Sequence, residues 1–199
     1  KDPDFWQKPD EPEVLGQLAM TYVIAKYGED LLVIDQHAAH ERLRFLELRH
    51  RAEHMEDGLS AQMMLVPQTF DVASEQASLL KDSLNVFRTC GFDLEHFGGA
   101  TWSINSVPVV LERLDPIAVV QDVLDDLEQQ GKSNRIENLR DQILIRTACH
   151  SSIRGGHYLT QNEMQELLVL MKKHKLSFTC PHGRPTIIRL SKDQLEKQF

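Results

Sequence analysis

The chain has 199 residues, of which 41% are hydrophobic and 26% charged, so it is long enough to bury one core or two small subdomains that share one. The longest apolar runs, at residues 31–34 and 167–171, are far too short to span a membrane, and nothing near the start resembles a signal peptide. We therefore expect a soluble cytoplasmic protein without a membrane partner. The formal net charge of -8 argues against a chain that binds nucleic acid unaided, because affinity for the phosphate backbone comes from Lys and Arg.

The three cysteines, Cys90, Cys149 and Cys180, are too few and too odd in number for a disulfide framework. Free thiols or thiolate metal ligands are the expected alternatives.

The first third of the chain predicts a hairpin that leads directly into a helix. Residues 1–13 are polar and rich in proline, which is typical of the end of a linker. Residues 15–27 and 30–36 predict two strands, the second buried, with turn chemistry between them. Apolar residues at helical spacing then predict a helix over residues 37–53.

The middle region reads as an α/β unit of its own. Residues 58–66 and Pro67 interrupt the pattern, and a helix is predicted over residues 74–89, with Leu80, Leu84 and Phe87 on one face and Gly91 ending it. Residues 92–107, with paired glycines inside, predict another hairpin. Asp115-Pro116 is a helix start that combines a cap with a first-turn proline.

The last third is predicted to be mainly helical. One helix is expected over residues 135–148 and another after Thr160, which has Glu163 at capping-box spacing. Cys149 is expected between these two helices. A short strand over residues 186–190 and a final helix from about Ser191 complete the chain.

Three potential metal ligands occupy the junction where the buried strand becomes a helix. His37 and Glu41 are four residues apart, so their side chains share a helix face, and Asp35 lies at the strand end. Carboxylate and imidazole ligands together suit zinc or manganese. A solvated helix face or a helix cap is the alternative interpretation.

Cys180 and His182 form a second half-site in a turn restricted by proline and glycine. The alternative is a buried structural cysteine beside an exposed histidine, and Cys149 could likewise be a core residue.

Three separated segments resemble, in the same order, the signature of the nuclease-competent MutL C-terminal domain. They are Asp35-Gln36-His37-Ala38-x-x-Glu41, Ala148-Cys149 and Cys180-Pro181-His182-Gly183-Arg184-Pro185. The similarity extends to Gly16-Gln17, Gly91-Phe92 and Phe97-Gly98-Gly99, and covers essentially residues 14–199.

The resemblance implies an α/β (α+β) fold of two small subdomains. Residues 14–67 plus 147–199, from both chain ends, would form a dimerisation subdomain with the metal site, and residues 68–146 an inserted external, regulatory subdomain. Carried over by motif position, Asp35, His37, Glu41, Cys149, Cys180 and His182 would be the metal ligands, and the first three would also be the catalytic residues. Arg184 would contact a phosphate, or would serve the structure of its turn.

The activity that the resemblance implies belongs to DNA mismatch repair and is the nicking of one strand of duplex DNA. Manganese or magnesium would support nicking, and zinc would be structural or regulatory. The implied partners are a second copy in a homodimer, DNA bound weakly, the β sliding clamp, MutS and an N-terminal ATPase region of the same chain. The implied location is the bacterial cytoplasm, in association with the nucleoid.

One position departs from the family motif. A second glutamate is expected five residues after Glu41, where this chain has Leu46, and Glu47 follows one place late. At about 100° per residue, neither position lies on the face of His37 and Glu41. The second glutamate is therefore not expected to be a direct ligand, but its displacement leaves a reduced or inactive variant as an alternative.

Gln62, Leu65 and Pro67 fit the pattern Gln-x-x-Leu-x-Pro, which resembles the peptide by which bacterial replication proteins dock on the β sliding clamp. The other interpretation is an apolar strand entry with Met64 and Val66 buried. A docking peptide would explain how an acidic domain reaches DNA.

The sequence therefore leaves two hypotheses from different classes. The first is a metal-dependent nicking endonuclease that also dimerises, weak in isolation. The second is a non-catalytic dimerisation and interaction module with a structural zinc. An unrelated zinc hydrolase is a distant third, because the chain has no His-Glu-x-x-His helix.

Overall fold

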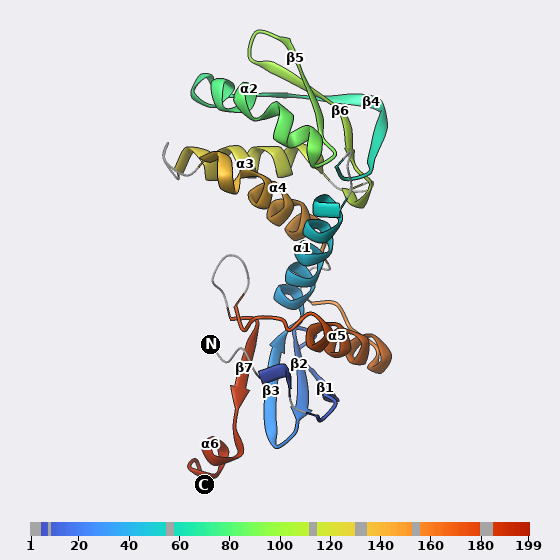
Figure 1. The fold of residues 1–199 in the computed structure, drawn as a ribbon, viewed down its shortest axis with the longest axis vertical. Coiled ribbons are helices and arrows are strands. Elements are labelled where there is room, and N and C mark those ends of the chain that lie inside the picture. The colour runs from blue at the N-terminus through green and yellow to red at the C-terminus, as the bar shows by residue number, and fades with distance from the viewer. Residues whose placement is uncertain are drawn as a thin grey trace. The chain divides into compact units, whose positions relative to one another are not determined.

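The computed structural model describes residues 5–7, 9–54, 58–111, 115–129, 135–152, 156–179 and 185–199, with the backbone only for residues 135–138. The elements follow one another along the chain as drawn in Figure 1. They are η1 (Phe5–Gln7), β1 (Glu13–Leu18), β2 (Tyr22–Tyr27), β3 (Asp30–Asp35), α1 (Gln36–His54), β4 (Ala61–Asp71), α2 (Ser74–Thr89), β5 (Asp93–Gly98), β6 (Thr101–Pro108), η2 (Val109–Leu111), α3 (Pro116–Gln129), α4 (Arg135–Ser151), α5 (Gln161–Lys173), β7 (Ile187–Leu190) and α6 (Lys192–Glu196).

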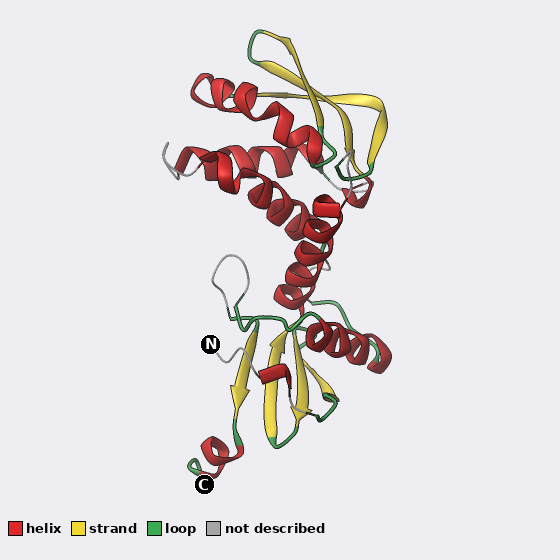
Figure 2. Ribbon diagram, viewed as in Figure 1, coloured by secondary structure: helices red, strands yellow, loops and turns green. Residues whose placement is uncertain are grey.

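The chain folds into two compact units. Each unit combines helices with an antiparallel sheet, which confirms the predicted α/β (α+β) class. Lys1–Arg44 and Ser152–Phe199 form the first, here called the terminal unit, and Phe45–Ser151 form the second, the middle unit. The predicted boundaries were at 67/68 and 146/147, whereas the compact units change over at 44/45 and 151/152. Helix α1, continuous in Figure 2, contributes residues to both.

The terminal unit is built on a four-stranded antiparallel sheet in the order β1-β2-β3-β7. Its alternating strands bury one set of side chains, among them Val23, Ala25, Leu32 and Ile34, each fully inaccessible to solvent. Helix α5 packs beside β1. From this helix, Gln165 receives a hydrogen bond from the Val14 amide at 3.3 Å and donates one to the Pro12 carbonyl at 2.8 Å. An edge strand is thereby partly covered.

The opening segment contributes to the core of the terminal unit, although it was predicted only as the end of a linker. Phe5 and Trp6 are 2% and 5% exposed, and Trp6 Nε1 donates a hydrogen bond of 2.8 Å to the Leu176 carbonyl. The ring of Phe5 meets Tyr27 and Phe178 edge-on. Polar composition misled the prediction because two aromatic residues are enough to anchor a short segment.

The predicted first strand, over residues 15–27, is wrong as a single strand. It contains a tight turn between β1 and β2, at which Ala19 and Met20 have φ angles of 51° and 50°. The Thr21 amide closes the turn on the Leu18 carbonyl at 3.1 Å. The turn contains none of the glycine, asparagine or proline residues that usually mark a left-handed turn, so no local signal predicts it.

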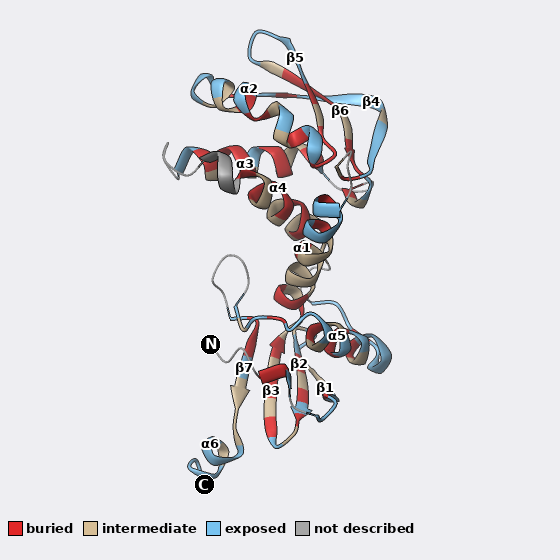
Figure 3. Cartoon of the chain, in the orientation of Figure 1, coloured by how far each residue is buried: buried red, intermediate tan, exposed pale blue. Residues whose placement is uncertain are grey.

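The middle unit pairs a sheet in the order β4-β6-β5 with helices α2, α3 and α4. Its core is continuous and apolar, and it includes Leu80, Phe87, Trp102 and Ile104. Figure 3 shows buried residues along α3, α4 and β6. The predicted helix over residues 74–89 and the predicted hairpin are confirmed.

Helix starts in the second half of the chain follow their predicted caps. Asp115 Oδ1 accepts hydrogen bonds from the amides of Ile117 at 3.0 Å and Ala118 at 3.3 Å. Thr160 and Glu163 form a complete capping box at the start of α5. Helix α4, by contrast, runs three residues beyond its predicted end, so Cys149 lies in its last turn and not between two helices.

Candidate metal centre

Asp35 closes the N-terminus of α1. It is the last residue of β3, and its backbone amide donates to the Thr186 carbonyl at 3.0 Å. Its Oδ1 accepts a hydrogen bond of 3.0 Å from the Ala38 amide. Such a contact satisfies one of the amides that a helix start leaves without a partner. The helix cap that the sequence left open as an alternative is therefore present.

His37 and Glu41 lie together one turn apart on α1, as their spacing predicted. The His37 Nε2 atom is 3.1 Å from Glu41 Oε1, and the side chains are 33% and 13% exposed. The pair is accessible on the histidine side and largely enclosed on the carboxylate side. One nitrogen and one oxygen ligand are thus presented side by side.

His40 stands beside this pair and was not predicted as part of the site. Its Nδ1 lies 2.7 Å from the Gln36 carbonyl, which can only accept, so Nδ1 carries the proton. Burial lowers the pKa of His40 below 6.5, and the neighbouring His37 and Arg44 lower it further against the raising effects of the Gln36 carbonyl and Glu163. His40 is therefore a neutral imidazole at neutral pH.

The structure does not test the remaining predicted ligands as members of this site. Cys149 is half-buried in the middle unit. Cys180, His182 and the predicted phosphate contact Arg184 lie outside the described residues. Across the described ranges, no three His, Cys, Asp or Glu side chains are grouped so as to hold a metal ion.

The donor chemistry of the junction fits a divalent ion in part. Two ligands of a tetrahedral zinc ion lie roughly 3.4 Å apart when each bond is about 2.1 Å. The 3.1 Å between His37 and Glu41 needs only a small opening to reach this. Two ligands do not complete a site, so the fit depends on further donors, which the sequence assigns to Asp35 and the two cysteine segments.

The two residues at the departure from the family motif, Leu46 and Glu47, have different surroundings on α1. Leu46 packs against the core of the middle unit. Glu47 instead forms an ion pair of 2.7 Å with Arg51 on the outer face of α1. The helical spacing predicts that neither side chain lies on the face of His37 and Glu41, and this stays a prediction.

The segment with the Gln-x-x-Leu-x-Pro pattern bulges from the edge of the middle sheet. In β4, Met63 pairs with Ser106 and Gln68 with Ile104, so the residues between them lie outside the regular ladder. Gln62, Leu65 and Pro67 are all exposed, Leu65 completely. The other interpretation, an apolar strand entry, is wrong for Val66, which is 76% exposed.

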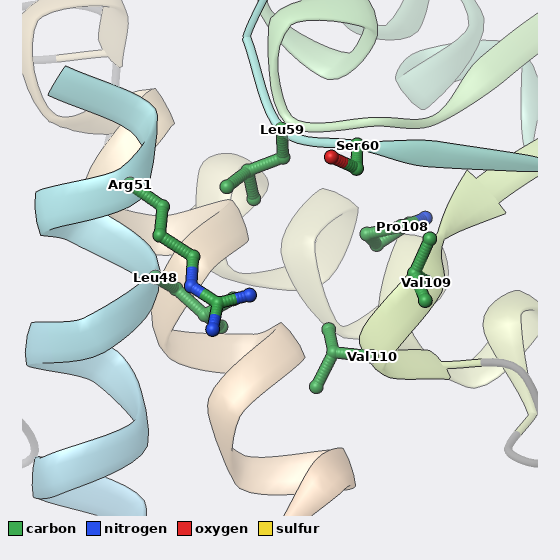
Figure 4. A pocket seen from close by; sticks show the side chains of 7 residues that line it. All are labelled: Leu48, Arg51, Leu59, Ser60, Pro108, Val109 and Val110. Carbon is green, nitrogen blue, oxygen red and sulfur yellow. The ribbon is translucent and has the colours of Figure 1, made fainter. Parts of the chain in front are cut away.

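A small cavity lies in the core region of the middle unit, away from the candidate ligands of α1 that are described above. The cavity in Figure 4 lies in the middle unit between Leu48, Leu59 and Val110, with Arg51 reaching toward it, and has a volume of about 40 Å³. It is large enough for one or two waters and no more.

One face of the terminal sheet is apolar and open. Cross-strand pairing puts Ile24, Val33 and Ile188 in one row, and Leu18 and Tyr22 in another. Among these, Leu18, Tyr22 and Ile188 are 59%, 40% and 54% exposed. Exposed apolar patches of this kind mark interaction surfaces.

None of the helices in the described part of the chain is both long and apolar enough to cross a membrane.

These features define a two-unit α/β domain with an open apolar sheet face and a histidine–carboxylate pair at a strand-to-helix junction. A family model described as the MutL C terminal dimerisation domain matches residues 15–159. The chain belongs to the MutL C-terminal dimerisation domain family.

Relatives named DNA mismatch repair protein MutL match nearly the whole chain. Those from Trichlorobacter lovleyi, Geotalea daltonii and Acidiphilium cryptum are 39%, 36% and 40% identical over 94%, 94% and 96% of this chain. The matches cover 31%, 31% and 33% of those proteins, so the chain spans about a third of the length of these relatives.

Proposed function

We propose that this domain serves DNA mismatch repair as a metal-dependent endonuclease that nicks one strand of duplex DNA. The observation that carries the proposal is the contact of 3.1 Å between His37 Nε2 and Glu41 Oε1 on the first turns of α1. Relatives with the mismatch-repair name match this stretch of the chain. The full ligand set is proposed as Asp35, His37, Glu41, Cys149, Cys180 and His182.

Bound divalent ions would supply the Lewis-acid chemistry that activates water, polarises the phosphodiester and stabilises the leaving oxygen. The two cysteines favour zinc for at least one position, whereas carboxylate oxygens suit manganese or magnesium. The residues of the chain act by position: the Asp35 cap orients the first turn of α1, and that turn presents His37 beside Glu41. Arg184 is proposed as a phosphate contact.

A plasmid-nicking assay with manganese tests the activity. Asp35→Asn retains the cap, because Asn is as good a cap as Asp, but it removes the charged ligand. The matched control is Asp71→Asn, at an exposed carboxylate on β4 that binds Thr101. We expect loss of nicking in the first variant and full nicking in the second. Undiminished nicking by Asp35→Asn would contradict the assignment.

A second proposed function is homodimerisation through the apolar face of the terminal sheet. Ile188 lies on this face and is 54% exposed, and Val169 on α5 is 46% exposed but belongs to a different surface. We expect Ile188→Lys to raise the dimer dissociation constant more than tenfold, since each lost 1.4 kcal/mol is about tenfold. Val169→Lys, the matched control, should leave it unchanged. Equal effects in sedimentation measurements would exclude this face.

We also propose that the exposed bulge of β4 docks on the β sliding clamp. This would compensate for the net charge of -8, which disfavours direct DNA binding. The test compares clamp-stimulated nicking by the Gln62→Ala, Leu65→Ala double variant with that by Met63→Ala, whose side chain is 80% exposed but outside the pattern. The double variant should lose stimulation, and equal nicking by the two proteins would refute this route.

MutS and an N-terminal ATPase region are further proposed partners, on the basis of the resemblance of the sequence motifs to the MutL family. The competing proposal, a non-catalytic dimerisation module with a structural zinc, predicts bound zinc and dimerisation without nicking under any metal.

A further inference from the structure

Gln36 is a fully buried polar residue at the first position of α1, between two proposed ligands. Its exposed fraction is 0%, so its carboxamide must find partners inside the protein. The carboxamide Nε2 donates to the Met20 carbonyl at 2.8 Å and to the His157 carbonyl at 3.0 Å. Its Oε1 accepts from Gln17 Nε2 at 2.7 Å. Only this orientation of the amide satisfies all three contacts.

Gln17 extends the network from β1. Its Nε2 also donates to the His157 carbonyl at 3.0 Å, and its Oε1 accepts from the Leu159 amide at 3.3 Å. The His157 carbonyl therefore receives two donors, one from each glutamine. The Gly156 amide adds a bond of 3.1 Å to the Met20 carbonyl. We call Gln17 and Gln36 the amide clamp.

The clamp joins three pieces of the terminal unit that are distant in sequence. These are the β1–β2 turn, the β3–α1 junction and residues 156–159 before α5. The turn has left-handed φ angles at Ala19 and Met20, a conformation that costs of order 1–3 kcal/mol at each such residue. Its Met20 carbonyl is the shared acceptor for Gln36 and Gly156. The strained turn is thus an anchoring point for the helix start.

We propose that Gln36 and Gln17 are positioning residues that fix the first turn of α1, and with it His37 and Glu41, in the geometry that binds metal. This inference rests on the proposed function. The clamp residues touch neither metal nor substrate and act through the backbone of the junction. Supporting residues of this kind typically change metal affinity about 10- to 100-fold.

The variants separate positioning from general stability. Gln17→Met removes the bonds to Gln36, His157 and Leu159. Gln165→Met is the matched control, because Gln165 also joins α5 to the β1 region through two hydrogen bonds, and both go to the backbone of Val14 and Pro12. Gln36→Glu keeps the acceptor but removes the donor, and turns a carboxylate toward two carbonyl oxygens.

Two measurements are made on the purified protein: amide hydrogen exchange, and affinity for Zn²⁺ and Mn²⁺ by chelator competition. Gln17→Met should speed hydrogen exchange of the Leu159 and Ala38 amides and weaken metal binding by about 10-fold or more. Folded Gln36→Glu protein should show at least as large a change in both measurements. Gln165→Met should leave both unchanged, even where its Tm falls as much.

Unchanged hydrogen exchange of the Leu159 and Ala38 amides in Gln17→Met would contradict the positioning role of the amide clamp. An equal loss of metal affinity in Gln165→Met would contradict it as well. If the wild-type protein binds neither metal, the proposed nuclease function fails, and the exchange data then decide by themselves whether the clamp fixes the start of α1.

Discussion

The His37 imidazole and the Glu41 carboxylate are in contact, with Nε2 and Oε1 3.1 Å apart on one face of α1. Glu41→Gln keeps the shape of the side chain but removes the charge, so we expect weaker metal binding with little change in Tm. Glu47→Gln is the control, since Glu47 forms a comparable ion pair with Arg51 on the same helix. Chelator competition should show a loss for Glu41→Gln alone, and equal affinities would argue against Glu41 as a ligand.

Asp35 has two separable roles, as a helix cap and as a proposed ligand. Asp35→Ala removes the acceptor for the Ala38 amide and should destabilise the protein by about 1 kcal/mol. Asp35→Asn should fold with nearly wild-type stability yet bind metal poorly. Chemical denaturation combined with metal titration checks both. Wild-type metal affinity in Asp35→Asn would leave Asp35 as a cap only.

Restoring the family glutamate should harm this chain. Leu46 packs against the core of the middle unit, so Leu46→Glu would place a carboxylate on apolar side chains at a cost of about 1–3 kcal/mol. Thermal unfolding should show a lower Tm with no gain in nicking. A Leu46→Glu variant with higher nicking activity and an unchanged Tm would contradict the structural role assigned to Leu46.

The two described cysteines should differ in reactivity. Burial raises the pKa of Cys90 to about 11, and only the thiolate reacts readily. In a Cys180→Ser background at pH 8, a thiol reagent should label the half-buried Cys149 and spare Cys90 until the protein is unfolded. Added zinc should protect Cys149 if it is a ligand. Equal labelling of both cysteines in the folded protein would contradict the packing around Cys90.

The α5 capping box gives a pH dependence with a definite sign. Hydrogen bonds from the backbone and then the hydroxyl of Thr160 lower the pKa of Glu163 below 4.5. This stabilisation is complete above pH 4.5 and is lost as the pH falls through the folded-state pKa. Thr160→Ala should move the pKa of Glu163 partly back toward 4.5 in an NMR titration.

The capping box of α6 is the control for this prediction. There Ser191 pairs with the neutral Gln194, so Ser191→Ala should lower stability equally across the same pH range. If the pKa of Glu163 in Thr160→Ala equals that in the wild-type protein, the Thr160 hydroxyl does not contribute to the lowered pKa of Glu163.

Features that depend on neighbours in sequence could be predicted. The Asp115 cap, the Thr160–Glu163 box and the shared face of His37 and Glu41 all arise within four residues. The turn at Met20 was not predicted, because its residue types are not typical of turns. Its carbonyl accepts a hydrogen bond from Gln36, which is not a neighbour in sequence.

The clamp could not be predicted for the same reason. Gln36 and His157 are 121 residues apart, and a glutamine next to a predicted helix start reads as an ordinary polar residue. Its only sequence signal is a polar side chain directly after a buried strand. Phe5 and Trp6 were missed because their partners, Tyr27, Leu176 and Phe178, come from other parts of the chain.

The most direct test of the proposed metal centre is the metal content of the purified protein after equilibration with zinc and manganese, compared with that of Cys180→Ser and His37→Ala. Circular dichroism would establish that each variant is folded. We predict bound metal in the wild-type protein and a reduced content in both variants. Absence of metal from the wild-type protein, or an undiminished content in both variants, would contradict a centre built from α1 and the Cys180 segment.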